Sequence, residues 1–220
     1  MADGGRYAAV IFDLDGVLVD SEGLGFATLR GLLREYGVDY REEDNAPFIG
    51  INDRDHFVAL KARYGIPTAV EDLLAEQTAR LLAQVATGTV PMPGVPAVIE
   101  RLHARYPLAV ASSSLPAVVE GRLRAVGVRH LFRAVVSSFE VPHGKPAPDV
   151  FLEAARRLAV PAAECLVIED SPHGLRAARA AGMRCAVVPT AGSWPTGGDG
   201  ADVRIASLVD LEPLLLPRPP

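Results

Sequence analysis

The sequence is poor in lysine and has no excess of positive charge. Of its 22 basic residues only Lys61 and Lys145 are lysines, and 27 acidic residues give a formal net charge of -5 at pH 7. A protein that binds duplex nucleic acid usually presents a basic surface, so we expect no nucleic acid partner. A small anionic substrate remains compatible with this charge, because a local positive site can lie in an acidic protein.

Long apolar runs and cysteines are also scarce. No apolar stretch is long enough to span a bilayer, and residues 1–6 contain no apolar signal core. The two cysteines, Cys165 and Cys185, each begin a short apolar run, which favours reduced, buried side chains over a disulfide or a metal pair. We therefore expect a soluble protein of a reducing compartment, the cytoplasm, with no membrane partner.

Short apolar runs alternate with helical patterns along most of the chain. A run that is apolar on every residue predicts a strand covered on both faces, as in a parallel sheet. Such runs occupy residues 8–12, 108–111, 134–136, 165–168 and 185–188, and helical stripes cross residues 95–102 and 151–158. The alternation predicts an α/β fold with a doubly wound, Rossmann-like parallel-sheet core.

The alternation is interrupted after the first strand. Residues 21–87 contain no convincing strand but three helical stripes, and Gly37 and Gly65 end the first two. The sequence thus predicts an all-helical cap domain at 21–87, inserted into a core domain of 1–20 and 88–220. Residues 87–96, with two glycines and three prolines, are expected to form the return hinge, and residues 192–200 a surface loop.

Two carboxylates follow the first predicted strand directly. Asp13 and Asp15 are two residues apart, so in extended chain they face one spot at the carboxyl end of the strand, where open α/β sheets bind ligands. Two such carboxylates repel each other unless a cation lies between them, and an oxygen-liganded ion such as Mg²⁺ suits them. A role in capping or in a turn is the alternative, and for Asp-x-Asp alone it is the commoner one.

Further polar groups follow other predicted strands. Glu169 and Asp170 end one strand and could complete an ion site, or cap the next helix. The serines at 112–114 end another strand, where hydroxyls and free amides can hold phosphate oxygens. Lys145 lies in a loop stiffened by Pro146 and Pro148, where a compact ammonium can be held beside developing negative charge.

Taken in their order along the chain, these four groups of polar residues, at 13–15, 112–114, 145 and 169–170, resemble the haloacid dehalogenase superfamily. The resemblance is greatest to its β-phosphoglucomutase-like phosphatase branch with a helical cap. The similarity runs from Val10 to about Pro189. Its motifs are residues 13–21, 112–114, 144–149, 169–174 and the run 177–183, which ends in Ala-Ala-Gly-Met. Their joint occurrence is far more specific than any one of them.

The resemblance implies a role for each group. Asp13 would attack phosphorus and form an aspartyl-phosphate, and Asp15 would act as general acid and then general base. Lys145 would offset the charge on Asp13 and the phosphoryl group. Mg²⁺ would be bound by Asp13, the backbone carbonyl of Asp15 and Asp170, with Glu169 as a ligand or as support for one. The phosphoryl oxygens would be bonded by Ser112, with Ser113 and Ser114 beside the substrate.

The predicted cap contributes the specificity in this family. Residues 50–55 resemble the cap loop that reaches the active site, which makes Asn52 and Arg54 candidate substrate-binding residues. Arg54 would suit a second phosphate or a sugar acid, and a surface arginine at the start of a helix is an equal alternative.

The sequence departs from the mutases of this branch. They carry a histidine near the hinge, where this chain has Gly25, and a cap lysine that Lys61 does not match. We therefore predict a magnesium-dependent phosphatase for a small phosphorylated metabolite such as a sugar phosphate, acting as a monomer or weak homo-oligomer. The alternatives are a sugar phosphomutase of the β-phosphoglucomutase type and a non-catalytic binding protein on the same scaffold. The pair Glu169 and Asp170 argues against the metal-free dehalogenase reaction, and the missing cap lysine against an aldehyde-cleaving relative.

Overall fold

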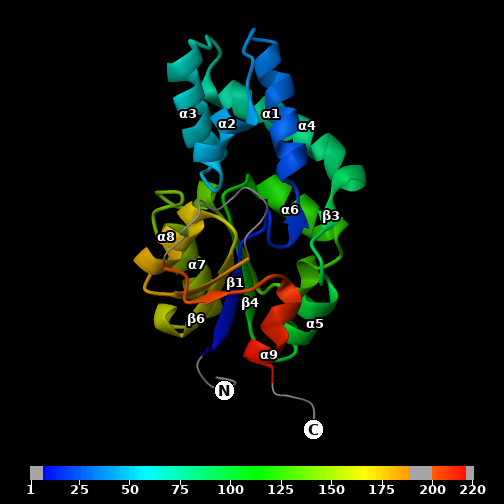
Figure 1. Ribbon diagram of the computed structural model, residues 1–220, viewed down its shortest axis with the longest axis vertical. Helices are drawn as coiled ribbons and strands as arrows, with labels where there is room; N and C mark the ends of the chain where they lie inside the picture. The colour runs from blue at the N-terminus through cyan, green and yellow to red at the C-terminus, as the bar shows by residue number, and fades with distance from the viewer. Residues whose placement is uncertain (1–6, 189–199, 217–220) are drawn as a thin grey trace.

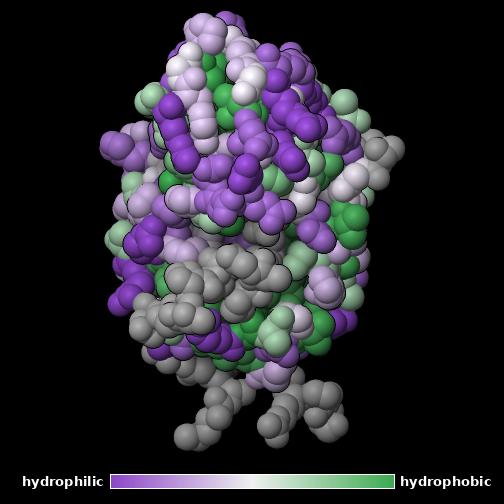
Figure 2. Space-filling view, turned by 45° about the horizontal axis from the view of Figure 1, so that its top comes forward, coloured by the Kyte–Doolittle hydropathy of each residue, from purple (hydrophilic) through white to green (hydrophobic). Residues whose placement is uncertain are grey.

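The computed structural model describes residues 7–188 and 200–216, in which a sheet-based core lies below a helical cap (Figure 1). The predicted loop at 192–200 therefore lies outside the described residues except for Gly200. Within the described ranges no helix is both long and apolar enough to cross a membrane. On the face shown in Figure 2, hydrophilic side chains cover most of the cap.

The core is built on a six-stranded sheet in which every pairing is parallel. The predicted strands and the α/β class are confirmed, and the sheet gains one short strand, β8, that the sequence pattern did not reveal. Across the sheet the order is β5-β4-β1-β6-β7-β8. The strands are β1 (Ala9–Phe12), β4 (Leu108–Ser112), β5 (Ala134–Ser137), β6 (Cys165–Glu169), β7 (Arg184–Val187) and β8 (Val203–Arg204).

Helices cover both faces of this sheet, which explains why its strands are apolar on successive residues. Along β1, Val10 and Phe12 pack into one core cluster, and Ala9 and Ile11 into another. The first cluster includes α5 (Ala97–His103), α6 (Pro116–Ala125) and α9 (Leu211–Leu215), and the second α7 (Asp149–Leu158) and α8 (Pro172–Ala180). Short 3-10 helices lie at Arg129–Leu131, Ser138–Glu140, Ala162–Glu164 and Leu208–Asp210. Both cysteines are free and buried, as predicted.

The cap is helical throughout and has a hydrophobic core of its own. Its largest buried side chains include Tyr40, Phe57 and Leu60. The helical stripes predicted for residues 21–87 are confirmed, and the helices are α1 (Glu22–Arg34), α2 (Glu42–Asn45), η1 (Ala46–Phe48), α3 (Asp53–Tyr64) and α4 (Val70–Gly88). Gly37 and Gly65 end helices with positive φ angles, 74° and 67°, which favour glycine because it has no Cβ.

The chain enters and leaves the cap through a two-stranded ribbon. In it β2 (Val19–Asp20) pairs antiparallel with β3 (Val90–Pro91), so that Val19 lies opposite Pro91. A pairing of two residues on each side, whose partners lie 70 and 72 positions apart, leaves no periodic signal, and the sequence predicted only a hinge here. The exact division of the chain at residues 21 and 87 stays a prediction.

The cap packs against the core beside α6. Helix α4 crosses α6 at Gly121, where a Cβ would lie 3.2 Å from Val85 Cγ1. A side chain at this position would therefore crowd α4, so the glycine allows the two helices to approach closely.

Candidate active site

The carboxyl ends of β1, β4 and β6 bring the predicted catalytic groups together. Asp13 directly follows β1, and its backbone N–H donates to the Ile168 carbonyl at 2.9 Å. Ser112 ends β4 and Glu169 ends β6, and these two strands flank β1 in the sheet. Parallel pairing therefore gathers side chains that lie up to 156 positions apart at one edge.

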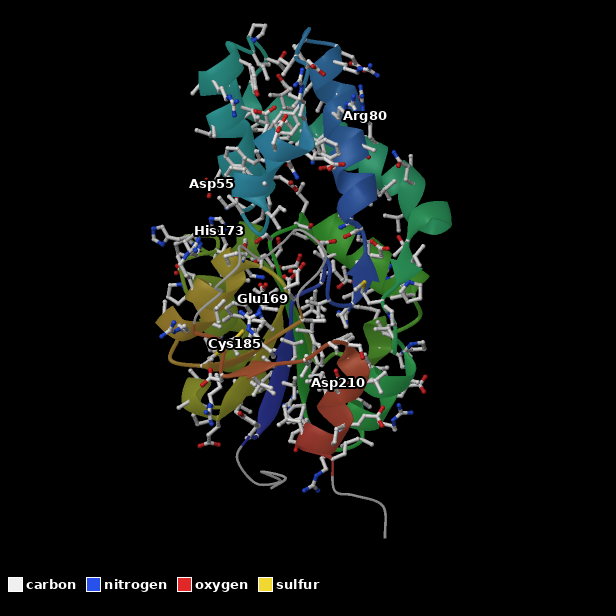
Figure 3. The ribbon with its side chains drawn as sticks, in the orientation of Figure 1. Asp55, Arg80, Glu169, His173, Cys185 and Asp210 are labelled. Carbon is white, nitrogen blue, oxygen red and sulfur yellow. The ribbon has the colours of Figure 1, made fainter. Side chains whose placement is uncertain are left out.

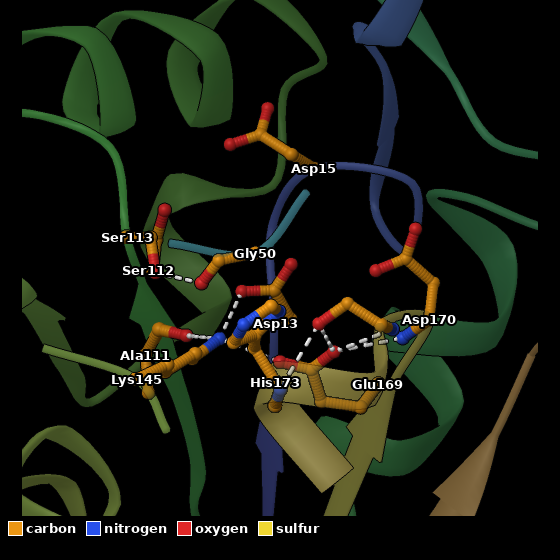
Figure 4. Close-up of polar contacts among 12 residues, drawn as sticks. Asp13, Asp15, Gly50, Ala111, Ser112, Ser113, Lys145, Glu169, Asp170 and His173 are labelled. Carbon is orange, nitrogen blue, oxygen red and sulfur yellow. Dashed lines mark hydrogen bonds and ion pairs between the residues drawn. The ribbon is translucent and has the colours of Figure 1, made fainter. Parts of the chain in front are cut away.

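Lys145 lies at the centre of this group (Figure 4). Its Nζ donates to Asp13 Oδ1 at 2.5 Å, to Glu169 Oε1 at 2.6 Å and to the Ala111 carbonyl at 3.1 Å. The lysine side chain is only 1% exposed. Burial lowers the pKa of Lys145, but the carboxylates of Asp13 and Glu169 outweigh it and hold the pKa above its ordinary value. Lys145 is thus a buried cation fixed between two acids.

Asp13 is held in a very different electrostatic state. Burial raises the pKa of Asp13 to about 7, the positive charge of Lys145 opposes this rise, and Glu169 adds to it. A cation bound to the same carboxylate would favour its charged form. The charged form of Asp13 therefore depends on positive charge nearby.

Three carboxylates of the site could hold a metal ion. One oxygen from each of Asp13, Glu169 and Asp170 lies within 4.8 Å of the others. Oxygen ligands suit Mg²⁺. Gly16, with φ 76°, lies against Asp170, where a Cβ would overlap Oδ2, so the turn leaves room for this carboxylate. The residues present therefore fit a hard divalent cation.

Both carboxylate oxygens of Glu169 are held by hydrogen-bond donors. While Oε1 accepts from Lys145, Oε2 accepts from the backbone N–H of Asp170 and of Ser171, both at 2.9 Å, and from the Ser171 hydroxyl at 3.0 Å. A carboxylate whose two oxygens both have donors is well placed to orient its neighbours. Glu169 is thus better suited to supporting Asp170 and Lys145 than to binding an ion by itself.

Asp15 lies apart from the Asp13–Lys145–Glu169 group (Figure 4). Its carboxylate forms an ion pair with Arg122 and accepts from the hydroxyls of Ser21 and Ser114, the latter at 2.8 Å. Neither Arg122 nor Ser21 was predicted as a site residue. Arg122 could have been found by its position, because it shares the buried face of α6 with Val118 and other apolar residues.

The three serines predicted as phosphate-binding residues occupy different places. Ser112 is fully buried, and its Oγ accepts from the Ser114 backbone N–H at 3.1 Å. Ser113 donates to the Gly50 carbonyl at 2.8 Å and thereby ties the core to the cap. Ser114 holds Asp15. Contact of these serines with a phosphate stays a prediction.

The two predicted cap residues also differ in their surroundings. Asn52 caps α3 by accepting from the Asp55 backbone N–H at 3.0 Å, and its side chain lies against Gly144 of the core. Arg54 pairs with Glu71 at 2.5 Å, and both side chains are about half exposed or more. Arg54 is not among the described residues that line the cavity next to Asp13.

A cavity of about 600 Å³ lies between the core and the cap, above the carboxylates. The core supplies Asp13, Asp15, Arg122 and Asp170, and the cap supplies a wall that includes Asp53. Beside this cavity the cap loop contacts the core, where His173 Nδ1 lies 3.0 Å from the Ile49 carbonyl oxygen. Figure 3 shows His173 at the junction of the two parts.

The family profile of the haloacid dehalogenase-like hydrolases matches residues 10–188. The chain belongs to this family. Within it, the helical cap and the relatives place the hydrolase in the CbbY and β-phosphoglucomutase-like group, and by homology it is a phosphatase.

The relatives of this haloacid dehalogenase-like hydrolase include two phosphatases. The fructose-1-phosphate phosphatase YqaB of Escherichia coli (strain K12) is 38% identical over 181 residues, which are 81% of this chain and 94% of YqaB. A phosphorylated carbohydrates phosphatase of Thermotoga maritima is 32% identical over 179 residues, 80% of this chain and 82% of the relative. A mutant of CbbY from Rhodobacter sphaeroides, solved with xylulose-(1,5)bisphosphate, has a TM-score of 0.85 and 30% identity, covering 96% of this chain and 100% of CbbY.

Proposed function

We propose that this protein is a magnesium-dependent phosphatase that hydrolyses a small phosphomonoester, such as a sugar phosphate, through an aspartyl-phosphate on Asp13. The observation that carries the proposal is the position of Asp13 at the floor of the cavity, 2.5 Å from the buried ammonium of Lys145 and beside Asp170. The activities of YqaB and of the Thermotoga maritima phosphatase support a sugar phosphate as the substrate class.

In the first half of the reaction, Asp13 attacks the phosphorus atom of the substrate. A bond forms between a carboxylate oxygen of Asp13 and phosphorus, and the bond from phosphorus to the ester oxygen breaks. Asp15, acting as general acid, gives its proton to the departing oxygen, so that a neutral alcohol leaves. This step requires the Asp15 side chain to turn from its contacts with Arg122 and Ser114 toward the substrate.

In the second half, water cleaves the aspartyl-phosphate. Asp15, now a carboxylate, takes a proton from the water as it attacks phosphorus, and the bond between phosphorus and Asp13 breaks. Inorganic phosphate leaves, Asp13 is regenerated, and Asp15 carries the proton needed for the next cycle. The atoms and charges of one hydrolysis therefore balance over two steps.

The remaining groups of the site neutralise and position charge. Lys145 offsets negative charge on Asp13 and on the phosphoryl oxygens, and its burial strengthens this effect because little water screens it. Mg²⁺, held by Asp13, Asp170 and the backbone carbonyl of Asp15 with Glu169 in support, would supply further neutralising charge. We expect Ser112 to donate a hydrogen bond to a phosphoryl oxygen, with Ser113 and Ser114 beside the substrate.

Two features favour hydrolysis over phosphomutase chemistry. At the position near the hinge where mutases of this group carry a histidine, Gly25 lines the cavity and supplies no functional group. In addition, Lys61 donates to the backbone carbonyls of Ile66 and Thr68, and it is not among the described residues that line the cavity. Among the described residues, the cap therefore lines the cavity with no lysine or arginine that would hold a second sugar phosphate as the phosphoryl acceptor.

The proposal is tested by measuring phosphate release from a panel of phosphorylated metabolites with Mg²⁺ and without any bisphosphate primer. We expect multiple turnovers, and we expect Asp13→Asn to abolish them. Borohydride reduction of the acid-quenched enzyme, followed by peptide mass spectrometry, should label residue 13 and no other. Isomerised sugar phosphate without phosphate release would favour the mutase instead, and turnover by Asp13→Asn would disprove the nucleophile.

A further inference from the structure

The cap side of the cavity above Asp13, called the roof below, is lined by Glu42, Glu43 and Asp53. Apart from the reacting groups, the charged residues that line the cavity are these three and Arg122 from the core. Within the described part of the lining, Arg122 is the one lysine or arginine. The segment 189–199, which the structure does not describe, contains no lysine or arginine either.

The histidine of the roof adds no positive charge. His56 lies against Tyr40, with Nε2 2.9 Å from the Tyr40 hydroxyl. Burial lowers the pKa of His56 to about 4, so the ring is neutral near pH 7. A second anionic group of a substrate would therefore find no free cation in the roof.

Arg122 forms an ion pair with one acid and acts electrostatically on a second. Its guanidinium forms an ion pair with Asp15, and its side chain is 5% exposed. The same charge acts on Asp53: burial raises the pKa of Asp53 to about 7, Asp15 adds to the rise, and Arg122 opposes it. Arg122 is thus paired with a core carboxylate and also acts electrostatically on a cap carboxylate, which makes it less available to a second anionic group of a substrate.

The wall next to Asp53 offers hydrogen-bond acceptors. Gln77 of α4 is buried and lines the cavity, and its Nε2 donates to Asp53 Oδ1 at 3.5 Å. Gln77 Oε1 has no hydrogen-bond partner among the described residues. Such an oxygen is costly when it is left unsatisfied, and a hydroxyl group is the kind of donor that satisfies it. Phe26, Leu29 and Ile51 supply apolar surface nearby, which suits the carbon skeleton of a sugar.

We propose that Asp53, supported by Gln77, is a specificity-determining residue that makes this phosphatase select monophosphates of otherwise neutral compounds, polyhydroxy alcohols above all, over substrates with a second anionic group. Above about pH 7, where Asp53 is ionised, a second phosphate or a carboxylate of a substrate is repelled by Asp53 together with Glu42 and Glu43. This inference rests on the proposed function for the position of the reacting phosphate, and it narrows the substrate class. The substrates expected here also differ from the ligand of CbbY, a mutant of which was solved with a bisphosphate.

Binding measurements test the inference independently of turnover. In the Asp13→Asn background, with Mg²⁺ present, calorimetry gives the dissociation constants of two matched pairs: fructose 1-phosphate against fructose 1,6-bisphosphate, and glycerol 3-phosphate against 3-phosphoglycerate. We expect the first member of each pair to bind at least about 10-fold more tightly, because juxtaposed like charges repel. Equal affinity within both pairs, or tighter binding of the second members, would overturn the inference.

Substitution of Asp53 assigns the preference to this residue. Adding Asp53→Asn to the Asp13→Asn background should reduce the preference about 10-fold. The matched control adds Glu71→Gln, which removes a carboxylate from the exposed surface of the same cap and should leave the preference unchanged. An unchanged preference in the Asp53 variant, with its fold verified by circular dichroism, would show that Asp53 does not determine specificity.

Turnover of p-nitrophenyl phosphate by the unmodified enzyme separates the two claims. This substrate carries neither a polyol nor a second charge, so it reports on phosphatase chemistry alone. If p-nitrophenyl phosphate is hydrolysed but the two ligands of each pair bind with equal affinity, only the role of Asp53 is rejected. No hydrolysis, together with the expected binding preference, rejects the proposed function and leaves the specificity of the cavity standing.

Discussion

Arg122 holds the carboxylate of Asp15 in an ion pair, although the two residues lie 107 positions apart in the chain. The arginine comes from the buried face of α6, and the aspartate from the turn after β1. Since Asp15 is the proposed proton donor and acceptor, Arg122 acts as a positioning residue: it sets where this carboxylate rests between its contacts with substrate.

We expect Arg122→Gln to impair catalysis through the protonation of the leaving group. For a sugar phosphate kcat/KM should fall about 100-fold, because small displacements of a catalytic group have effects of this size. For p-nitrophenyl phosphate, whose leaving group needs little protonation, the loss should stay below about 10-fold. Steady-state kinetics with both substrates measures the difference.

The control for this variant is Arg124→Gln on the same helix. Its guanidinium is 74% exposed and pairs only with Glu120 among the described residues, so both rates should stay near those of the unmodified enzyme. Equal losses of Arg122→Gln on both substrates would indicate a general structural role in place of a positioning role.

Lys145→Met should destabilise the fold as well as abolish turnover. The substitution leaves Asp13 and Glu169 as buried carboxylates without their shared cation, and breaking such a pair costs about 3–5 kcal/mol. Urea denaturation should show this loss. In a double-mutant cycle, adding Glu169→Gln should restore part of it, because one of the two uncompensated charges is then gone. Additive losses would mean that the two side chains are not energetically coupled.

Gly16 and Gly37 have nearly the same φ angle, so alanine at each position distinguishes the effect of backbone strain from that of a contact at the proposed metal site. Gly16 has φ 76° and Gly37 has φ 74°, so alanine should cost about 1–2 kcal/mol at either position. Only at Gly16 would the new Cβ overlap Asp170, whereas nothing lies within 4 Å at Gly37. We expect only Gly16→Ala to raise the Mg²⁺ concentration that gives half-maximal activity, which a titration with the ion measures. Similar activation curves for both variants would argue against the site.

The titration of Asp53 should be visible in the dependence of stability on pH. Its pKa is about 7 in the folded protein against an ordinary value of 3.8, so between these values the folded state keeps a proton that the unfolded state releases. Its contribution to the free energy of unfolding is therefore largest below about pH 4. It declines by at most about 1.4 kcal/mol per pH unit up to about pH 7, and is constant above.

Asp53→Asn removes this titration. The variant should therefore become more stable relative to the unmodified protein as the pH rises from 4 to 7. Urea denaturation at several pH values gives the difference curve. A flat curve, or one that rises toward acid, would contradict the assigned pKa.

Much of the core could be predicted because its signals are local. Strands apolar on every residue, and acids directly after them, indicate both the sheet and its active edge. Lys145 could be singled out because lysine is rare in this chain and prolines stiffen its loop. The two-residue strand β8 could not be predicted, since a run of this length has no period.

The cap was harder to read because neighbouring residues on a helix point in different directions. Asp53 and Arg54 both lie in the first turn of α3, but about 100° apart around its axis. The sequence made Arg54 a candidate substrate contact, with a surface arginine as an equal alternative, and gave Asp53 no role. The structure places Asp53 in the cavity lining and pairs Arg54 with Glu71 outside it. Which of the two faces the cavity depends on how α3 is rotated, and packing against the core decides this.

The ribbon of β2 and β3 makes the cap an exchangeable unit. Because Val19 lies opposite Pro91, the inserted segment begins and ends at one point of the core. Relative to the sheet it is therefore a closed loop. The entropy of closing a loop changes slowly with its length, by about 0.6 kcal/mol for each doubling. Loop closure therefore sets little limit on the length of the inserted segment. A different cap has only to reproduce the contacts that Ser113, His173 and α6 make with this one, so new substrates can be acquired by exchanging one continuous segment.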